Sequence, residues 1–144
     1  QNAPFQKRSA RSIAAIARGG YVLSDAADGA PRCIIIATGS EVQLALDAQQ
    51  RLAADGVGVR VVSMPSTTVF DRQDAQYRDS VLPRGIPRVA VEAGVSDGWR
   101  KYVGLDGAVI GIDRFGESAP AGELFKFFGF TAERVAAAVK SVLQ

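Results

Sequence analysis

The feature that most constrains the fold is a pair of apolar segments on either side of an amphipathic helical segment. Residues 33–37 are apolar throughout, which is typical of a strand that is covered on both faces. Ser40 then begins the S-x-x-Q spacing of a helix capping box, and Gly56 is a natural stop for the helix. Residues 57–64 form a second, mostly apolar segment. Together, residues 33–64 predict one β-α-β unit with a right-handed crossover.

The alternation of apolar runs with helical patterns continues toward the C-terminus. It favours a three-layer α/β/α sandwich with a mostly parallel sheet and one antiparallel edge strand near 21–23. The helix after Ser40 is expected to bury a stripe that ends at Leu52 and Ala53. Thr131 is expected to cap the final helix. The predicted strands of the parallel part are 33–37, 58–64, 88–92 and 108–113.

Gly19-Gly20 divides the chain into two unequal parts. Residues 1–18 are polar around a short apolar segment, and we expect an N-terminal arm or interdomain linker with one helical turn. Residues 19–144 contain no internal repeat and no long linker, so we expect a single α/β domain there. The first residue is Gln rather than Met, which favours a fragment or a processed product.

The composition excludes several classes of site. The chain has no histidine and one cysteine, so it lacks a Ser-His-Asp triad, a Cys-His pair and a zinc site of His and Cys ligands. The net charge of +2 is scattered, which argues against nucleic acid as a partner. No apolar run approaches the roughly 20 residues that cross a bilayer, so no membrane partner is expected. Cys33 lies next to three isoleucines and is expected to be buried, unreactive and reduced, in a cytoplasmic setting.

Candidate binding residues lie where the predicted strands end. Thr38, Gly39 and Ser40 join a strand to a helix, and free backbone N–H groups there could hold an anionic effector. A simple, well-capped βα turn explains the same residues. Glu92 and Asp113 could form an acid–base pair if their strands are neighbours.

Three aromatic residues lie within four positions of one predicted short helix. Such closely spaced rings cannot all face one core, so one side of that helix is a candidate subunit or domain interface. The residues are Phe125, Phe127 and Phe128.

Several segments resemble the transketolase family, in the family's order and over essentially the whole chain. The most similar is Ile110-Gly111-Ile112-Asp113-Arg114-Phe115-Gly116-Glu117-Ser118-Ala119-Pro120. One departure is the segment 67–69, where a more acidic or smaller sequence is expected. The other matching segments are 19–23, 37–41, 61–66, 70–71, 77–83, 91–94, 98–99, 101–104, 123–124 and 128–131, together with Val135. The resemblance identifies this chain as similar to the third, C-terminal domain of a transketolase.

The resemblance implies an activity for the complete enzyme. Transketolases are homodimers that transfer two-carbon ketol units between sugar phosphates in the pentose phosphate pathway, using thiamine diphosphate and a divalent metal (Mg or Ca). Their N-terminal and middle domains, which this chain lacks, carry the cofactor, the metal and the catalytic histidines. The chain has neither histidine nor the G-D-G motif. It begins at a Gln-Asn pair that in the family follows a substrate-phosphate arginine. We therefore assign it no catalytic, cofactor-binding or metal-binding residue, and we expect it to be inactive alone.

Several functions stay open at this point. The first is a structural and dimer-supporting module of a transketolase, and the second is a regulatory module that binds an anion or nucleotide at the strand ends. A third is a free-standing enzyme built on carboxylates. The C-terminal domains of deoxyxylulose-phosphate synthase and of 2-oxo acid dehydrogenases are related alternatives, although the segment 116–120 favours transketolase.

Overall fold

A computed structural model describes residues 10–39, 41–92, 99–111 and 131–144. Its centre is a five-stranded sheet in the order β1-β3-β2-β4-β5. β1 lies at one edge and pairs antiparallel with β3, whereas the other neighbouring strands are parallel. The prediction of a mostly parallel sheet with one antiparallel edge strand is thus confirmed. The strands are β1 (Tyr21–Ser24), β2 (Cys33–Ala37), β3 (Val59–Ser63), β4 (Arg88–Glu92) and β5 (Ala108–Gly111).

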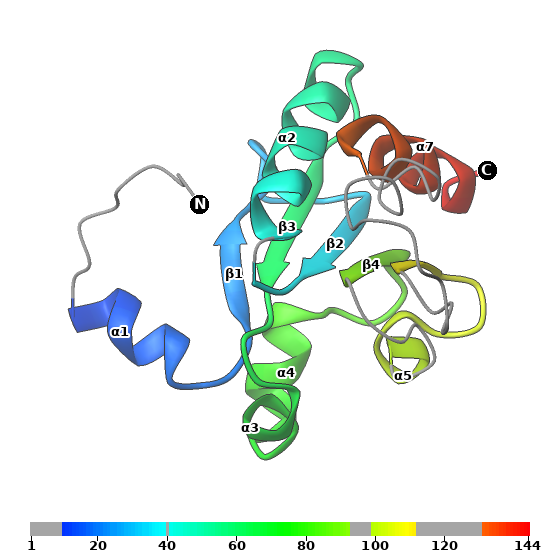
Figure 1. The fold of residues 1–144 in the computed structure, drawn as a ribbon. Coiled ribbons are helices and arrows are strands. Elements are labelled where there is room, and N and C mark those ends of the chain that lie inside the picture. Colours follow the sequence, from blue (N-terminus) through cyan, green and yellow to red (C-terminus); the bar gives the residue numbers. More distant parts are fainter. Residues whose placement is uncertain (1–9, 40, 93–98, 112–130) are drawn as a thin grey trace, which may run out of the picture.

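Helices cover both faces of the sheet, which gives the three layers that the sequence predicts (Figure 1). α2 and α7 pack on one face, and α3, α4 and α5 pack on the other. α1 lies apart from the sheet. The helices are α1 (Ala10–Ile16), α2 (Glu41–Ala54), α3 (Thr67–Asp71), α4 (Ala75–Val81), α5 (Arg100–Val103) and α7 (Ala132–Val142).

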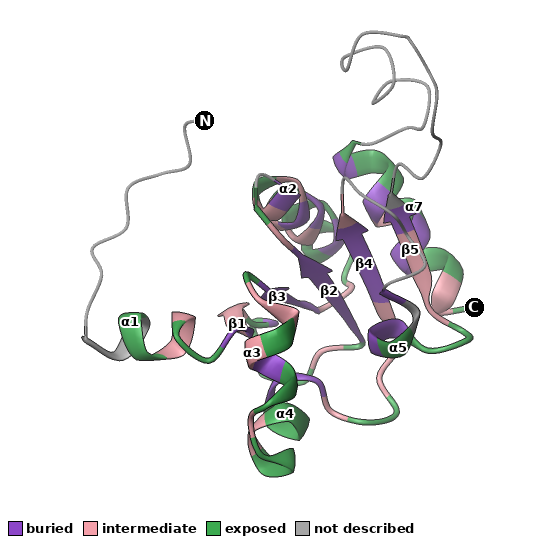
Figure 2. Cartoon of the chain, turned by 60° about the horizontal axis from the view of Figure 1, so that its bottom comes forward, coloured by how far each residue is buried: buried purple, intermediate pink, exposed green. Residues whose placement is uncertain are grey.

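Side chains alternate between two cores along the central strands. Cys33, Ile35 and Ala37 face α2 and α7, whereas Ile34 and Ile36 face the other helical layer. All five are fully buried, because a central parallel strand has helices on both sides. Figure 2 shows this burial along β2 and β4.

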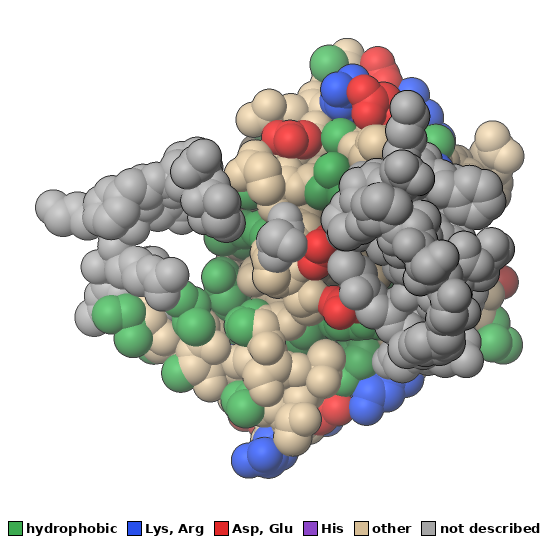
Figure 3. All heavy atoms as spheres, in the orientation of Figure 1, with side chains coloured by type: hydrophobic (Ala, Val, Ile, Leu, Met, Phe, Trp, Pro, Cys, Tyr) green, Lys and Arg blue, Asp and Glu red, His purple; other side chains and the backbone are tan. Residues whose placement is uncertain are grey.

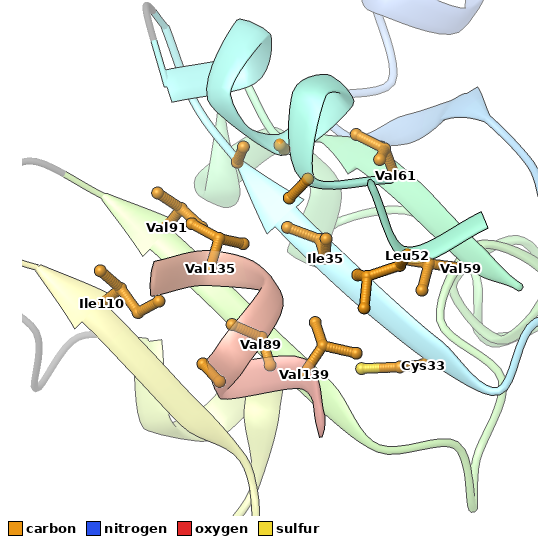
Figure 4. Close-up of a cluster of buried hydrophobic side chains, with 14 residues drawn as sticks. Cys33, Ile35, Leu52, Val59, Val61, Val89, Val91, Ile110, Val135 and Val139 are labelled. Carbon is orange, nitrogen blue, oxygen red and sulfur yellow. The ribbon is translucent and has the colours of Figure 1, made fainter. Parts of the chain in front are cut away.

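The core beneath α2 and α7 joins both helices to four strands, β2, β3, β4 and β5. Figure 4 shows Leu52 of α2 and Val135 of α7 directed toward Ile35, Val89 and related side chains of the sheet. The buried stripe predicted for α2 is wrong at its last residue. Ala53 is exposed, and Ala48 is buried together with Ala45 and Leu52. One residue turns a helix by about 100°, so the neighbour of a fully buried Leu52 faces solvent.

Side-chain caps begin three of the helices, including the final one. The Thr131 hydroxyl accepts a hydrogen bond from the Arg134 N–H (3.2 Å), which confirms the predicted cap. Ser66 and Asp74 cap α3 and α4 in the same way. These caps satisfy N–H groups that lack partners within the helix.

Two arginines, here called the arginine clamp, tie the end of α4 to the sheet. Arg60 of β3 and Arg88 of β4 lie on either side of Ile34 in the same register row, so all three side chains share a face. Arg60 donates to the carbonyl oxygens of Ser80 (3.0 Å) and Val81 (3.1 Å). Arg88 donates to those of the next two residues, Leu82 (2.8 Å) and Pro83 (3.1 Å). The clamp thus binds four successive carbonyl groups at the C-terminal end of α4 and just beyond it, where helical hydrogen-bond donors are missing.

The segment that enters the domain is held close to α3 and α4. Gly19 has φ +85°, and a Cβ atom there would overlap the Ser66 carbonyl oxygen. The Tyr77 hydroxyl donates to the Gly20 carbonyl oxygen (2.7 Å), and the Arg18 guanidinium lies 4.5 Å from the centre of the Tyr77 ring. These contacts hold the Gly19-Gly20 segment against α3 and α4.

Candidate functional site

Two of the predicted polar residues meet at the carboxyl edge of the sheet. Thr38 follows β2 and Glu92 ends β4, and these strands are parallel neighbours with Ala37 opposite Val91. The Thr38 hydroxyl donates a hydrogen bond to a carboxylate oxygen of Glu92. The structure therefore places a carboxylate at the loop where the sequence analysis expects an anion.

The backbone at the start of α2 uses part of the donor set expected for that anion. The Glu41 N–H donates to the Thr38 carbonyl oxygen (3.0 Å), and the Val42 N–H donates to that of Gly39 (3.3 Å). Ser40 lies outside the described residues. The anion site at Thr38–Ser40 stays a prediction, and the ordinary capped turn accounts for the contacts that the structure describes.

The remaining predicted site residues are only partly within the described chain. Glu92 lies opposite Gly111 on adjacent strands, so the condition for a Glu92–Asp113 pair is met, but Asp113 lies outside the described residues. Phe125, Phe127 and Phe128 also lie outside them. Both the acid–base pair and the aromatic interface stay predictions.

Cys33 occupies the position that the sequence predicts. Its side chain is fully buried at the start of β2, and no disulfide involves it. Burial raises the pKa of the Cys33 thiol to about 12, although a hydrogen bond with the Ile34 backbone acts in the opposite direction. At neutral pH the sulfur is therefore a thiol rather than a nucleophilic thiolate.

A cavity of about 460 Å³ lies between α3, α4 and α5, and the sequence analysis missed it. Four cations and two carboxylates line it, together with an apolar floor of Phe70 and Leu82. Figure 3 shows basic and acidic side chains side by side along this lower edge of the molecule. The charged residues are Arg78, Arg84, Arg88, Lys101, Asp71 and Asp79. This set is called the cationic groove below.

One rim of the cationic groove is a closed ion-pair network. Lys101 donates to Asp71 (2.8 Å), and the Tyr102 hydroxyl donates to the same carboxylate (2.9 Å). Burial acts against ionisation of Asp71, but the bonds from Lys101 and Tyr102 outweigh it and lower the pKa of this carboxyl. Burial and the neighbouring carboxylate raise the pKa of Tyr102. Lys101 and Asp71 therefore neutralise each other.

No local motif points to this groove. Three arginines follow one another at positions 78, 84 and 88, but that spacing matches neither a helix face nor a strand face. Only the packing of α5 against β4 brings Lys101 to the same cavity. No helix among the described residues is long and apolar enough to cross a membrane.

Comparisons with known proteins agree on one family. The model of the transketolase-like C-terminal domain matches residues 19–131. Transketolase 1 of Vibrio cholerae is 58% identical over 144 residues, and Transketolase 1 of Escherichia coli is 59% identical over the same length. Both alignments cover 99% of this chain but 22% of the relative, so the chain spans about a fifth of the relatives' length.

A solved structure has the same fold. The transketolase of Leishmania mexicana superposes with a TM-score of 0.82 at 44% identity, covering 96% of this chain and 20% of that chain. These relatives are transketolases, so the related C-terminal domains of deoxyxylulose-phosphate synthase and 2-oxo acid dehydrogenases are not favoured. The chain belongs to the transketolase family and corresponds to its C-terminal domain.

Proposed function

We propose that this chain is the structural and dimer-supporting part of an enzyme that transfers two-carbon ketol units between sugar phosphates. The observation that carries the proposal is the similarity to transketolases along the whole chain, combined with the small share of those proteins that it covers. On this proposal the N-terminal and middle domains are its partners, and the complete homodimer works in the cytoplasm on the pentose phosphate pathway.

The described residues do not fit thiamine diphosphate or its metal. Among them, no group of three or more His, Cys, Asp or Glu side chains could hold a metal ion. The sequence as a whole has no histidine to move protons around a cofactor. We therefore assign thiamine diphosphate and the divalent metal to the domains that precede this one, and we derive no catalytic step from its residues.

The contribution of this domain is then rigid packing. Its strands are buried between two helical layers, and the Gly19-Gly20 segment is anchored to α3 and α4. With residues 1–18 as the linker, this anchor would hold a preceding domain in a fixed orientation. Phe125, Phe127 and Phe128 are our candidates for the contact with the rest of the dimer.

Isothermal titration calorimetry with thiamine diphosphate and magnesium tests the proposal. The 144-residue chain should give no heat of binding and no ketol transfer, and the longer protein that contains it should give both. Removal of the domain from the longer protein should shift sedimentation from dimer toward monomer. Micromolar cofactor binding by the 144-residue chain would refute the proposal, and so would an unchanged dimer after the removal.

The regulatory alternative has its own test. A thermal-shift screen of the chain with nucleotides and phosphates would support effector binding at Thr38–Ser40 if the melting temperature rose and Thr38→Val abolished the rise. The Thr38–Glu92 hydrogen bond favours the structural role, because a carboxylate beside the loop repels an anion.

A further inference from the structure

The cationic groove has more positive charge than its own carboxylates neutralise. Among the residues that the structure describes, four cations and two carboxylates line it, which leaves two positive charges. Lys101 and Asp71 pair directly. Arg84 and Asp79 are 3.9 Å apart, and the Arg84 side chain is 86% exposed, so this pair is weak. The excess positive charge therefore belongs to Arg78, Arg84 and Arg88, which line the groove next to α4.

Arg88 is a half-buried cation whose described hydrogen bonds go to neutral groups. It donates to the carbonyl oxygens of Leu82, Pro83 and Tyr102 (2.8, 3.1 and 2.6 Å). In the described part of the chain, no carboxylate forms an ion pair with it. Burial lowers the pKa of Arg88, and the nearby Asp79 carboxylate offsets this only in part.

Two of these three arginines, Arg78 and Arg88, retain N–H donors for a ligand. A guanidinium has five N–H groups. Arg88 uses three of them on carbonyl oxygens. Arg78 uses its Nε–H on the Gln73 carbonyl oxygen (3.0 Å), and within the described residues its terminal nitrogens have no hydrogen-bond partner, although its charge acts on Asp71. Paired guanidinium forks are the usual means by which proteins bind the oxygens of a phosphate group.

We propose that the cationic groove binds a small phosphate monoester. Arg78 and Arg84 bind the dianionic phosphate group directly, and Arg88 supplies further positive charge beside it. The two excess positive charges match the charge of about −2 on a phosphate monoester at neutral pH. The volume of about 460 Å³ is larger than inorganic phosphate needs and lies in the range of small-molecule sites. Phe70 and Leu82 provide an apolar floor for the organic part of the ligand.

This site differs from the one that the sequence analysis expects. Arg88 begins β4, whereas Glu92, beside Thr38, ends the same strand. The two places therefore lie at opposite ends of β4. The inference also stands apart from ketol transfer, because it depends only on residues of this domain. Failure of the longer protein to transfer ketol units would leave it intact, and absence of phosphate binding would leave the family assignment intact.

Titration of the isotope-labelled 144-residue chain with glycerol 3-phosphate, followed by NMR at constant ionic strength, tests the proposal. Amide shifts of Asp79, Arg84 and Lys101 should saturate together, with a dissociation constant of about 1 mM or tighter. Inorganic phosphate should bind more weakly, because it makes no use of the apolar floor. Acetate, which has one charge and two oxygens, should bind more weakly still.

Matched variants separate a built site from general attraction. Arg78→Gln should weaken binding by about tenfold, because it removes a charged donor from the phosphate. Arg78→Lys should recover part of the loss. Arg72→Gln is the control, since Arg72 is an exposed residue at the end of α3 that does not line the groove. It should change binding by less than about twofold.

Three results would overturn the proposal. The first is a linear, unsaturated response to glycerol 3-phosphate. The second is an equal loss of affinity in Arg72→Gln and Arg78→Gln. The third is tighter binding of a hexaglutamate peptide than of glycerol 3-phosphate, which would assign the groove to an acidic protein partner. Near- and far-ultraviolet circular dichroism of each variant establishes that the fold is retained.

Discussion

Arg60 is the residue whose removal should most clearly expose how α4 is held to the sheet. Its side chain is 11% exposed and makes four hydrogen bonds. Two of them go to Asp25 (3.0 Å each), and the others go to the carbonyl oxygens of Ser80 and Val81. Arg60→Met keeps most of the side-chain volume and removes every donor. The change therefore isolates the polar contacts from the packing.

The free-energy cost of Arg60→Met depends on how far water can reach each former partner of Arg60. Breaking a buried ion pair by removing one partner costs about 3–5 kcal/mol. The Asp25 side chain is 36% exposed, so water replaces part of its lost contacts, and the value must be discounted. The hydrogen bond to the Val81 carbonyl oxygen is buried and has no such replacement. We expect a loss of about 3 kcal/mol in the free energy of unfolding, or about 10 °C in Tm for a domain of this size.

Urea unfolding gives the measurement. Trp99 is the single tryptophan and is 8% exposed in the core beside α3, α4 and α5, so its fluorescence reports on the layer that the clamp holds. Circular dichroism provides a second probe of the same transition. The control is Arg51→Met. Arg51 pairs with Glu133 at 2.9 Å, but the two side chains are 54% and 66% exposed, so its loss should cost less than about 1 kcal/mol.

Two results would refute this reasoning. If Arg60→Met and Arg51→Met destabilised the domain equally, burial would not be the reason that the Arg60 contacts stabilise the domain. If Arg60→Met cost less than about 1 kcal/mol, the four hydrogen bonds would contribute no more than a surface ion pair does. A double-mutant cycle with Asp25→Asn then separates the ion pair from the two carbonyl contacts.

Three further predictions concern single residues. The buried Cys33 thiol, whose pKa is raised to about 12, should react with a thiol reagent at least about a thousandfold more slowly in the native protein than in urea; comparable rates would contradict this. The hydrogen bond from Arg60 is the main cause that lowers the pKa of Asp25. The stabilisation that Asp25 contributes should therefore be present above about pH 4 and lost as pH falls through the lowered pKa. Urea midpoints measured at about pH 3 and about pH 6 should then differ less in Asp25→Asn than in the unchanged protein. Gly19→Ala should cost about 3 kcal/mol or more, since it combines φ +85° with overlap of the Ser66 carbonyl oxygen. Gly29→Ala, with φ +72° and open space around it, should cost about 1–2 kcal/mol, and equal melting temperatures for the two variants would contradict the steric argument.

The fold was more predictable than the candidate sites. Strands 33–37 and 88–92 were predicted at their observed bounds, because a run of apolar residues between turn residues is a local signal. The predicted anion donors at Thr38–Ser40 depend on how a helix start is bonded. The structure shows the N–H groups of Glu41 and Val42, just after this segment, bonded to the carbonyl oxygens of Thr38 and Gly39. Which donors stay free at a turn depends on its backbone conformation, which composition does not specify.

The sequence by itself determined the position of the described strands to within two residues at their ends, the two-sided burial of the central strands and the family, because each of these follows from short-range patterns of residue type. Only the tertiary structure decided the sheet order, and that order puts Arg60 and Arg88 on either side of Ile34. The arginine clamp and the cationic groove both follow from this placement. Their members come from strands and helices far apart along the chain. Register and crossover bring them together through contacts that no local periodicity encodes.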